Sequence, residues 1–353
     1  MKEYSKHIIP KKAIVKDALI MLDKLSGDVQ TLFVVDENEI MQGTLTDGDI
    51  RRAFISGYTL ESKIDKVYKT DFHFIYEKQN NVEEIRETRK QGILLLPCLN
   101  KEKKLINIYN LKKTKNILPI DAILMAGGKG MRLRPLTENT PKPLLPIGDK
   151  PIIDYNVESL IQNGVENINV TINYLGSLIE KHFENYSNDI KINCIREPKF
   201  LGTIGSVKFV RKLNNDYVLL MNSDLFTNID YEDFFRYFMK NEADMAVAAV
   251  PYSVNIPYGI FDIEKGYIKA LKEKPSYDYY ANAGIYIIKT KLLDLIPDDT
   301  FFDATDFMKK LIAEGHSVVR YPLIGYWYDI GKMEDYNRVR DIARHLSYRK
   351  NGE

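Results

Sequence analysis

A glycine cluster followed by two basic residues is the part of this 353-residue sequence with the clearest chemistry. Gly127, Gly128 and Gly130 follow a β-type run, then comes Arg132 and, ten residues later, Lys142. Glycines let backbone N–H groups approach phosphate oxygens, because no Cβ stands in the way. Arginine forks onto two phosphate oxygens, and lysine adds a compact positive charge. The spacing therefore predicts a loop that binds phosphate groups.

This loop differs from two common phosphate-binding loops. Leu133 stands where GxGxxG has its third glycine, and the GxxxxGK[ST] spacing is absent. On the glycines alone, a tight strand–loop turn with solvated charges fits equally well.

Two aspartates could hold a divalent cation beside the loop. Asp224 follows the apolar residues of LLMNSDLF, and Asp329 follows the aromatic run of GYWYDIGK. Transfer between two anionic reactants needs positive charge and usually a metal, because the reactants repel each other. Each aspartate by itself also fits a turn former or a helix N-cap.

Strands alternate with helices from residue 120 onward, and this pattern would position those groups. The predicted strands are Asp121–Met125, Ile168–Asn173, Lys191–Ile195, Tyr217–Met221 and Met245–Val250, with a helix at Ile152–Gln162 stopped by Gly164. The alternation predicts a mostly parallel sheet covered on both faces. Ligands of such sheets gather at the carboxyl ends of the strands, where the glycine loop falls.

Residues 1–118 follow a different pattern, which changes near Asn116–Asp121, and they are expected to form a domain separate from 119–353. A helix, a strand, a turn and a second strand occur twice here. The first copy is Val15–Leu25, Thr31–Val35, Asp36–Asn38 and Gly43–Thr46, followed by a helix at Asp49–Ile55; the second is Val82–Arg89, Ile93–Leu96, Asn100–Lys103 and Leu105–Tyr109. A unit of this size cannot bury its helix and sheet alone, so the two copies are expected to pack together.

Composition indicates an ordinary globular protein, with 44% hydrophobic and 28% charged residues. The formal net charge of +1 gives no reason to expect nucleic acid or a membrane surface as partner. Cys98 and Cys194 form no CxxC motif, and no apolar stretch is long enough for a membrane span. We therefore expect a cytoplasmic protein.

The string from Ala122 to Leu160, AILMAGGKGMRLRPLTENTPKPLLPIGDKPIIDYNVESL, resembles the signature of the sugar nucleotidylyltransferase family, GG-x-G-x-R-[LM]-x-P-[LM]-T-x-x-x-PKP. Every fixed position is met, and the resemblance covers about residues 120–345. It implies an α/β, Rossmann-like (GT-A-like) domain with a mostly parallel mixed sheet. By the match, Gly127, Gly128, Gly130 and Arg132 hold the triphosphate, Lys142 contacts the reacting phosphates, and Asp224 and Asp329 bind Mg²⁺.

Further segments resemble the substrate-binding parts of this family. EPKFLGTIGSVK (Glu197–Lys208) resembles the nucleobase segment, LKEKPS the motif that contacts the sugar phosphate, and NAGIYIIK and Tyr258–Gly259 the sugar pocket. The residues implied for the nucleotide are Ala126, Glu197, Gly202, Thr203 and Asn222, and those for the sugar 1-phosphate are Gly259, Glu273, Lys274 and Asn282. Without the resemblance, Thr203 fits a helix cap and the Glu-Lys pair fits a solvated surface.

The implied reaction joins a nucleoside triphosphate to a sugar 1-phosphate and releases pyrophosphate. Arg132, Lys142, Lys274 and the metal would act by positioning and charge neutralisation, so no general base is needed. The Leu-Gly-Thr-x-Gly string and Glu197 favour GTP, because a carboxylate can accept from both the N1–H and the amino group of guanine. UTP and CTP stay open.

GTLTDGDIRRAF (Gly43–Phe54) resembles the end of a CBS unit, which makes residues 1–118 a tandem CBS domain. The resemblance implies that Thr46 and Asp49 bind an adenine nucleotide, whereas helix capping explains both residues equally well. Asn110 and Lys113 replace them in the second copy. CBS pairs associate through their faces, so a homo-oligomer is expected.

The two-domain combination resembles the bacterial glucosamine-1-phosphate guanylyltransferases of nonulosonic (legionaminic) acid synthesis. Mannose 1-phosphate is the alternative sugar. A rival of another class is a nucleotide-sensing protein with an inactive transferase domain, but Arg132, Lys142 and both aspartates are present.

Overall fold

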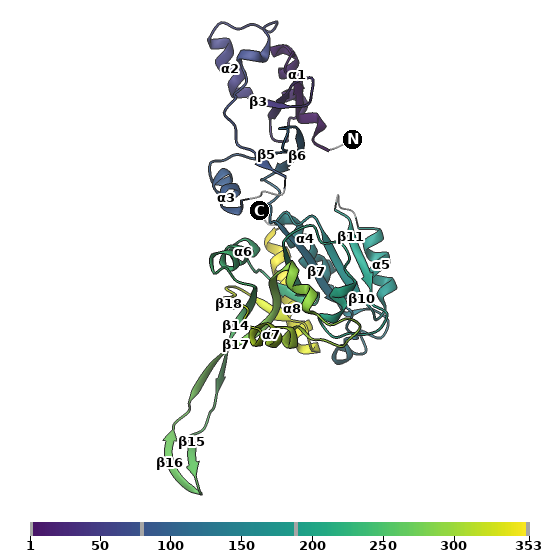
Figure 1. Ribbon diagram of the computed structural model, residues 1–353, viewed down its shortest axis with the longest axis vertical. Helices are drawn as coiled ribbons and strands as arrows, with labels where there is room; N and C mark the ends of the chain where they lie inside the picture. Colours follow the sequence, from purple (N-terminus) through teal and green to yellow (C-terminus); the bar gives the residue numbers. More distant parts are fainter. Residues whose placement is uncertain (1–2, 78–80, 187–189, 351–353) are drawn as a thin grey trace. The chain divides into compact units, whose positions relative to one another are not determined.

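The chain divides into two compact units, and each is described here by itself. The first is Met1–Leu118 with Gln162–Gly164, and the second is Pro119–Ile161 with Val165–Glu353. The structure is a computed structural model that describes residues 3–77, 81–186 and 190–350, the last six by their backbone alone (Figure 1).

The first unit contains the same small motif twice. In each copy the first two strands are parallel and the third is antiparallel to the second. The copies are β1 (Ile8–Pro10), α1 (Val15–Lys24), β2 (Thr31–Val35), β3 (Met41–Thr46) and α2 (Asp47–Ile55), then β4 (Ile75–Tyr76), α3 (Val82–Lys90), β5 (Leu95–Leu99) and β6 (Leu105–Asn110). Phe33 and Met41 share a buried cluster with Leu95 and Leu99, so the two copies pack together as the sequence predicts.

The second unit is built on a seven-stranded sheet with the order β11-β10-β7-β12-β17-β14-β18. Its strands are β7 (Ile120–Ala126), β10 (Ile168–Ile172), β11 (Ile192–Arg196), β12 (Tyr217–Asn222), β14 (Met245–Asn255), β17 (Ser276–Lys289) and β18 (Val318–Pro322). Only β17 runs antiparallel to its neighbours among these strands. The predicted mostly parallel, mixed α/β sheet is therefore confirmed.

The chain leaves β7 towards β10 on one side and returns to β12 on the other. The strand order thus reverses at β7, and the carboxyl end of such a strand is where open α/β sheets bind ligands. Buried Asp121 fixes the opposite end of β7, because its carboxylate accepts hydrogen bonds from the N–H groups of Asn214 (2.7 Å) and Asn215 (2.9 Å).

Helices and short strands complete the second unit. The helices are α4 (Ile152–Gln162), α5 (Gly176–Glu184), α6 (Tyr231–Lys240), α7 (Ala304–Ala313) and α8 (Met333–Lys350), and the short strands are β8 (Pro146–Ile147), β9 (Lys150–Pro151), β13 (Leu225–Thr227) and β19 (Trp327–Asp329). Short 3₁₀ turns lie in the second unit at Met131–Leu133, Lys142–Leu144, Gly205–Phe209 and Thr290–Leu295. The first unit has two such turns among its described residues, at Glu3–His7 and Ile64–Lys66. Among the described residues, no helix is long and apolar enough to cross a membrane.

Strands β14 and β17 continue beyond the sheet as a two-stranded ribbon that ends in β15 (Ile260–Glu264) and β16 (Tyr267–Lys272) (Figure 1). We call residues 251–281 the arm. The predicted strand Met245–Val250 is thus only the base of β14, which runs on to Asn255.

Candidate active site

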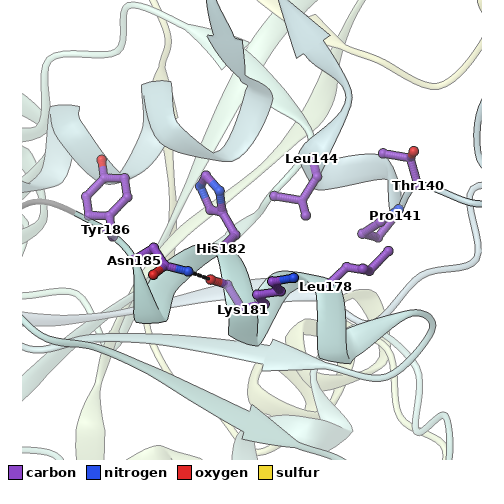
Figure 2. A pocket seen from close by; sticks show the side chains of 8 residues that line it. All are labelled: Thr140, Pro141, Leu144, Leu178, Lys181, His182, Asn185 and Tyr186. Carbon is purple, nitrogen blue, oxygen red and sulfur yellow. Dashed lines mark hydrogen bonds between the residues drawn. The ribbon is translucent and has the colours of Figure 1, made fainter.

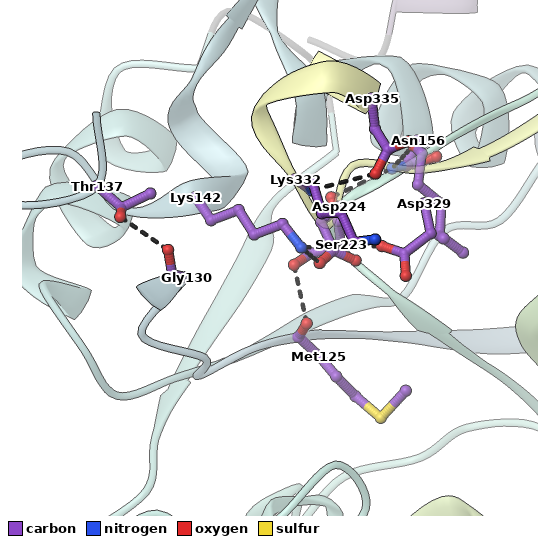
Figure 3. Close-up of polar contacts among 11 residues, drawn as sticks. Met125, Gly130, Thr137, Lys142, Asn156, Ser223, Asp224, Asp329, Lys332 and Asp335 are labelled. Atoms are coloured by element: carbon purple, nitrogen blue, oxygen red, sulfur yellow. Dashed lines mark hydrogen bonds and ion pairs between the residues drawn. The ribbon is translucent and has the colours of Figure 1, made fainter. Parts of the chain in front are cut away.

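The glycine loop connects β7 to a 3₁₀ turn at the carboxyl end of the sheet. Gly130 has a left-handed φ of 60°, and the Thr137 hydroxyl donates to its carbonyl oxygen at 2.9 Å (Figure 3). A Cβ on Gly130 would lie 3.0 Å from Thr137 Cγ2 and 3.2 Å from Lys142 Cβ. Glycine is therefore required here both by conformation and by space.

Asp224 and Asp329 lie side by side because their segments pair. Strands β13 and β19 are antiparallel with Leu225 opposite Asp329, and Asp224 directly precedes Leu225. The Ser223 hydroxyl donates to the Met125 carbonyl at 2.8 Å, and the Asn156 amide donates to the Leu225 carbonyl at 2.9 Å. These bonds fix the Asp224 turn against β7 and α4.

Lys142 places its ammonium between the two carboxylates (Figure 3). It pairs with Asp224, and its Nζ lies 3.8 Å from Asp329 Oδ1. Burial and the neighbouring Asp224 charge raise the pKa of Asp329, while Lys142 and Arg132 partly offset them. The Arg132 guanidinium lies near the segment that carries Asp329, since a Cβ built on Gly331, two residues after Asp329, would be 3.4 Å from the guanidinium. The structure thus brings together four residues that the sequence singles out.

The donor set fits Mg²⁺ bound together with phosphates. Among the described residues, no group of three or more His, Cys, Asp or Glu side chains could hold a metal. Mg²⁺ is commonly held by one or two carboxylates plus substrate phosphates and water, and here two carboxylates converge on one positive charge.

Glu197 lies against the first glycine of the loop. A Cβ on Gly127 would stand 2.2 Å from Glu197 Oε1, and the Leu201 N–H donates to Oε2 at 3.2 Å. The side chain is buried, and burial raises the pKa of its carboxyl to about 7, while the Leu201 hydrogen bond lowers it. A carboxyl poised between its two forms near neutral pH is thus part of this site.

Gly202 and Thr203 have packing roles near Glu197. Gly202 has φ 79°, and a Cβ there would be 2.7 Å from the Phe302 carbonyl oxygen. The Thr203 hydroxyl accepts from the Ala304 N–H at 2.8 Å, at the start of α7. The alternative interpretation of Thr203 is a cap for the helix that follows it, but that segment is a 3₁₀ turn and the hydroxyl caps α7 instead. Nucleotide binding by Thr203 stays a prediction.

The predicted sugar-phosphate residues do not join this cluster. Gly259, Glu273 and Lys274 lie on the arm, and a Cβ on Gly259 would be 2.9 Å from Glu273 Oε2. Lys274 precedes Gly284 by ten residues of ribbon, roughly 30 Å of extended chain. Gly284 packs against the Asn222 side chain, because a Cβ built on Gly284 would lie 2.5 Å from Asn222 Nδ2. Lys274 is therefore too far from Asp224 to act on the same phosphate within this chain.

The predicted sugar residue Asn282 lies in β17 at the base of the arm. The Asn282 side-chain oxygen accepts from the Gly284 N–H at 2.9 Å, and its amide donates to Tyr286 Oη at 2.8 Å. Ala126 and Gly128 continue the glycine loop, and no heavy atom lies within 4 Å of a Cβ built on Gly128.

The sequence interpretation missed Asn156, Ser223 and Thr137. These side chains hold the Asp224 turn and the glycine loop in place. Asn156 could have been found from the sequence, because it is a polar residue on the buried face of the amphipathic helix α4.

A separate pocket of about 500 Å³ lies behind the Lys142 loop (Figure 2). Thr140, Pro141 and Leu144 form one wall, and α5 residues such as Leu178 and His182 form the other. Its lining includes none of the predicted site residues, so we keep it apart from the active site.

In the first unit, Thr46 and Asp49 form a reciprocal cap at the start of α2. The Thr46 N–H donates to Asp49 Oδ2 at 2.9 Å, and Arg52 pairs with Oδ1 at 2.6 Å. Burial raises the pKa of Asp49, but the Thr46 and Arg52 hydrogen bonds outweigh it and the net pKa is lowered. The structure thus shows the capping arrangement, and nucleotide binding by these residues stays a prediction.

The sequence of the second unit resembles a known family of enzymes. The sequence profile of the family described as nucleotidyl transferase matches residues 121–344. The chain belongs to this family, as its motifs predict.

The relatives include sugar-phosphate enzymes by name. A protein named putative mannose-1-phosphate guanyltransferase from Sulfolobus acidocaldarius is 31% identical over 235 residues, 65% of each chain. A bifunctional protein GlmU from Methanocaldococcus jannaschii is 34% identical over 61% of this chain and 52% of its own length. The chain thus spans less than two thirds of these curated relatives. The crystal structure of HddC from Yersinia pseudotuberculosis matches with a TM-score of 0.51 and 26% identity, over 63% of this chain and 98% of that one.

Proposed function

We propose that the second unit transfers a nucleoside monophosphate from a nucleoside triphosphate to a sugar 1-phosphate and releases pyrophosphate. One observation carries the proposal: Lys142 lies between Asp224 and Asp329, beside the glycine loop and Arg132. This arrangement suits two polyanionic reactants that must be held close together.

In the proposed reaction, a sugar-phosphate oxygen attacks the α-phosphorus. A new P–O bond forms, the bond to the β-phosphate bridging oxygen breaks, and pyrophosphate leaves with that electron pair. The nucleophile is already an anion, so no residue needs to remove a proton. Arg132 and Lys142 offset the phosphate charge. Asp224 and Asp329 would hold Mg²⁺, which when bound neutralises charge between the phosphates.

For the nucleotide we propose GTP. Glu197 supports this, because a buried carboxylate beside Gly127 can accept hydrogen bonds from guanine N1–H and the amino group, whereas uracil offers one such donor. Relatives named as guanyltransferases point the same way. UTP and CTP are the alternatives.

For the sugar we propose glucosamine 1-phosphate, for nonulosonic (legionaminic) acid synthesis, on the resemblance of the two-domain chain. Mannose 1-phosphate is the second candidate, because several relatives carry that sugar in their names. Gly259, Glu273, Lys274 and Asn282 are the residues proposed to bind it.

For the first unit we propose a CBS-like regulatory or oligomerising role in a cytoplasmic protein. Its duplicated motif with a shared core supports a paired arrangement of this kind.

The test is a panel of the four nucleoside triphosphates against glucosamine 1-phosphate, N-acetylglucosamine 1-phosphate and mannose 1-phosphate, read by pyrophosphate release with and without a chelator. We expect the fastest release with GTP and glucosamine 1-phosphate, and none after Mg²⁺ is removed. If another combination of nucleoside triphosphate and sugar 1-phosphate releases pyrophosphate faster, that combination replaces the proposed substrates. No release with any pair would favour a nucleotide-binding protein with an inactive transferase unit.

A further inference from the structure

The outer part of the arm has one apolar face and one face of mixed character. Phe261 pairs with Leu271 and Ile263 with Ile268 across β15 and β16. Directly paired residues share a face, as do residues two apart on one strand, so these four side chains lie together. The opposite face is mixed: Lys272 and Asp262 lie 3.6 Å apart on it, and Glu264 pairs with the exposed Tyr267.

This apolar face is open to solvent within the described chain. Phe261 is 53% exposed, Ile263 66%, Ile268 60% and Leu271 58%. Antiparallel sheets with one apolar face normally pack that face on a core, and an isolated two-stranded ribbon is only marginally stable in water. The face therefore requires a cover.

The arm cannot fold back onto its own unit without losing strand pairs. β14 and β17 stay in register without interruption from Ala249 opposite Asn282 to Asn255 opposite Ser276. Bending the ribbon towards Asp224 would break this ladder, whose pairs are continuous with the central sheet. A cover from outside the chain keeps every pair intact.

The area of the arm suits a second copy of this chain. Counting both faces of the arm, ten large hydrophobic side chains, tyrosines included, are more than a third exposed. At roughly 100 Å² each, they present on the order of 1,000 Å² per arm. Two arms exchanged between two copies would bury about 2,000 Å² of arm surface, which is in the range of homodimer interfaces.

The second unit also has exposed apolar side chains around its own site. Met131, in the turn after the glycine loop, is 54% exposed. Phe200, three residues after Glu197, is 48% exposed and stacks edge-on with the exposed Phe301. The surface that an incoming arm would meet is thus apolar next to the proposed nucleotide site.

We propose that two copies exchange arms, so that the arm of one copy delivers Glu273 and Lys274 to the cluster of Lys142, Asp224 and Asp329 in the other. Each chain by itself holds the sugar-phosphate lysine and the phosphate cluster roughly 30 Å apart along the ribbon, and exchange brings them together. The inference rests on the proposed function for the role of Lys274, but the dimer it requires can be tested without activity.

The decisive experiment pairs two inactive variants, Asp224→Asn and Lys274→Ala. The two chains are co-expressed with different affinity tags, and the heterodimer is isolated by tandem purification. In an exchanged dimer, one of the two equivalent sites combines a wild-type cluster with a wild-type arm, so about half of the wild-type activity returns. Lys269→Ala, elsewhere on the arm, serves as the control and keeps full activity.

Three results would overturn the exchange. These are an inactive heterodimer beside an active wild type, failure to recover any heterodimer, and full activity of Lys274→Ala alone.

A second measurement separates this inference from the proposed function. The variant Phe261→Ser/Ile263→Ser/Ile268→Ser/Leu271→Ser removes the apolar face. Analytical sedimentation should show weaker self-association of this variant than of the wild type, with an unchanged circular dichroism spectrum. An association constant equal to that of the wild type, or a monomeric wild type, refutes the exchange. If the wild type dimerises through the arm but transfers no nucleotide to any sugar phosphate, the proposed function fails and the arm interface stands.

Discussion

Lys142 offsets the charge of the carboxylates that it lies between. Burial and the Asp224 charge raise the pKa of Asp329, and Lys142 partly offsets them. Without Lys142, Asp224 and Asp329 would repel each other more strongly. The sequence predicts these residues because each follows a strand at the ligand-binding edge of the sheet. It does not predict the Lys142–Asp224 pair, which joins segments 82 residues apart.

Glu197 provides a pH-dependent prediction at the residue scale. Guanine donors favour the ionised carboxylate, whose pKa is raised to about 7 in the free protein. GTP binding should therefore strengthen as the pH rises from 6 to 8, and the affinity of Glu197→Gln should change little over that range. Calorimetric titration of GTP across this pH range measures both. Equal pH dependence in the two proteins would contradict the role of Glu197.

The same carboxyl affects stability with the opposite sign. Between its ordinary pKa of 4.5 and about 7, the folded protein keeps a proton that the unfolded chain has lost. Its contribution to the free energy of unfolding is present below pH 4.5 and is lost as the pH rises through 7. Urea unfolding of wild type and Glu197→Gln at pH 5 and pH 8 should show the variant gaining relative stability at the higher pH.

At the element scale, the glycine loop depends on the left-handed conformation of Gly130. Gly130→Ala should cost about 1 kcal/mol of unfolding free energy and also lower nucleotide affinity, because the new Cβ meets Thr137 and Lys142. Gly92→Ala is the matched control, with φ 80° but open space around it. It should lose similar stability with unchanged pyrophosphate release. If both variants kept full nucleotide affinity, the packing around Gly130 would be irrelevant to binding.

Helix α2 tests the capping interpretation of Thr46 and Asp49. Thr46→Ala removes one half of the reciprocal cap and should cost about 1 kcal/mol of unfolding free energy in the first unit. Thr70→Ala, at an exposed position, should cost much less. Thermal unfolding of both variants measures the difference. Equal stability would argue that Thr46 is retained for another purpose, such as a ligand.

Element boundaries show where local pattern is insufficient. The predicted strand Ile93–Leu96 stops before Pro97, because proline cannot donate to a sheet ladder, yet β5 runs through Pro97 to Leu99. β1 and β4 are too short to give a periodic signal. The arm was missed for another reason: no strand was predicted between Val250 and Asn282, and only long-range pairing decides whether strands there return to the sheet or leave it.

At the scale of the whole molecule, the chain combines a nucleotidyl transferase unit with a duplicated α/β motif. Motif matches predicted the family and the phosphate cluster, because both depend on residues close in sequence or at neighbouring strand ends. They could not predict that Lys274 lies on an exposed ribbon, because that position depends on seven consecutive pairs between β14 and β17, from Ala249 opposite Asn282 to Asn255 opposite Ser276. The proposed exchange of arms reconciles the sugar residues with the cluster.

The central claim is that Asp224 and Lys142 serve nucleotidyl transfer rather than folding. The most direct test compares wild type, Asp224→Asn and the control Asp341→Asn, an exposed carboxylate on α8, by the formation of nucleotide sugar from GTP and sugar 1-phosphate. We predict that Asp224→Asn loses turnover by at least a hundredfold, on the order of 3 kcal/mol, with an unchanged unfolding transition, while Asp341→Asn resembles wild type. Near-wild-type turnover in Asp224→Asn would contradict the account.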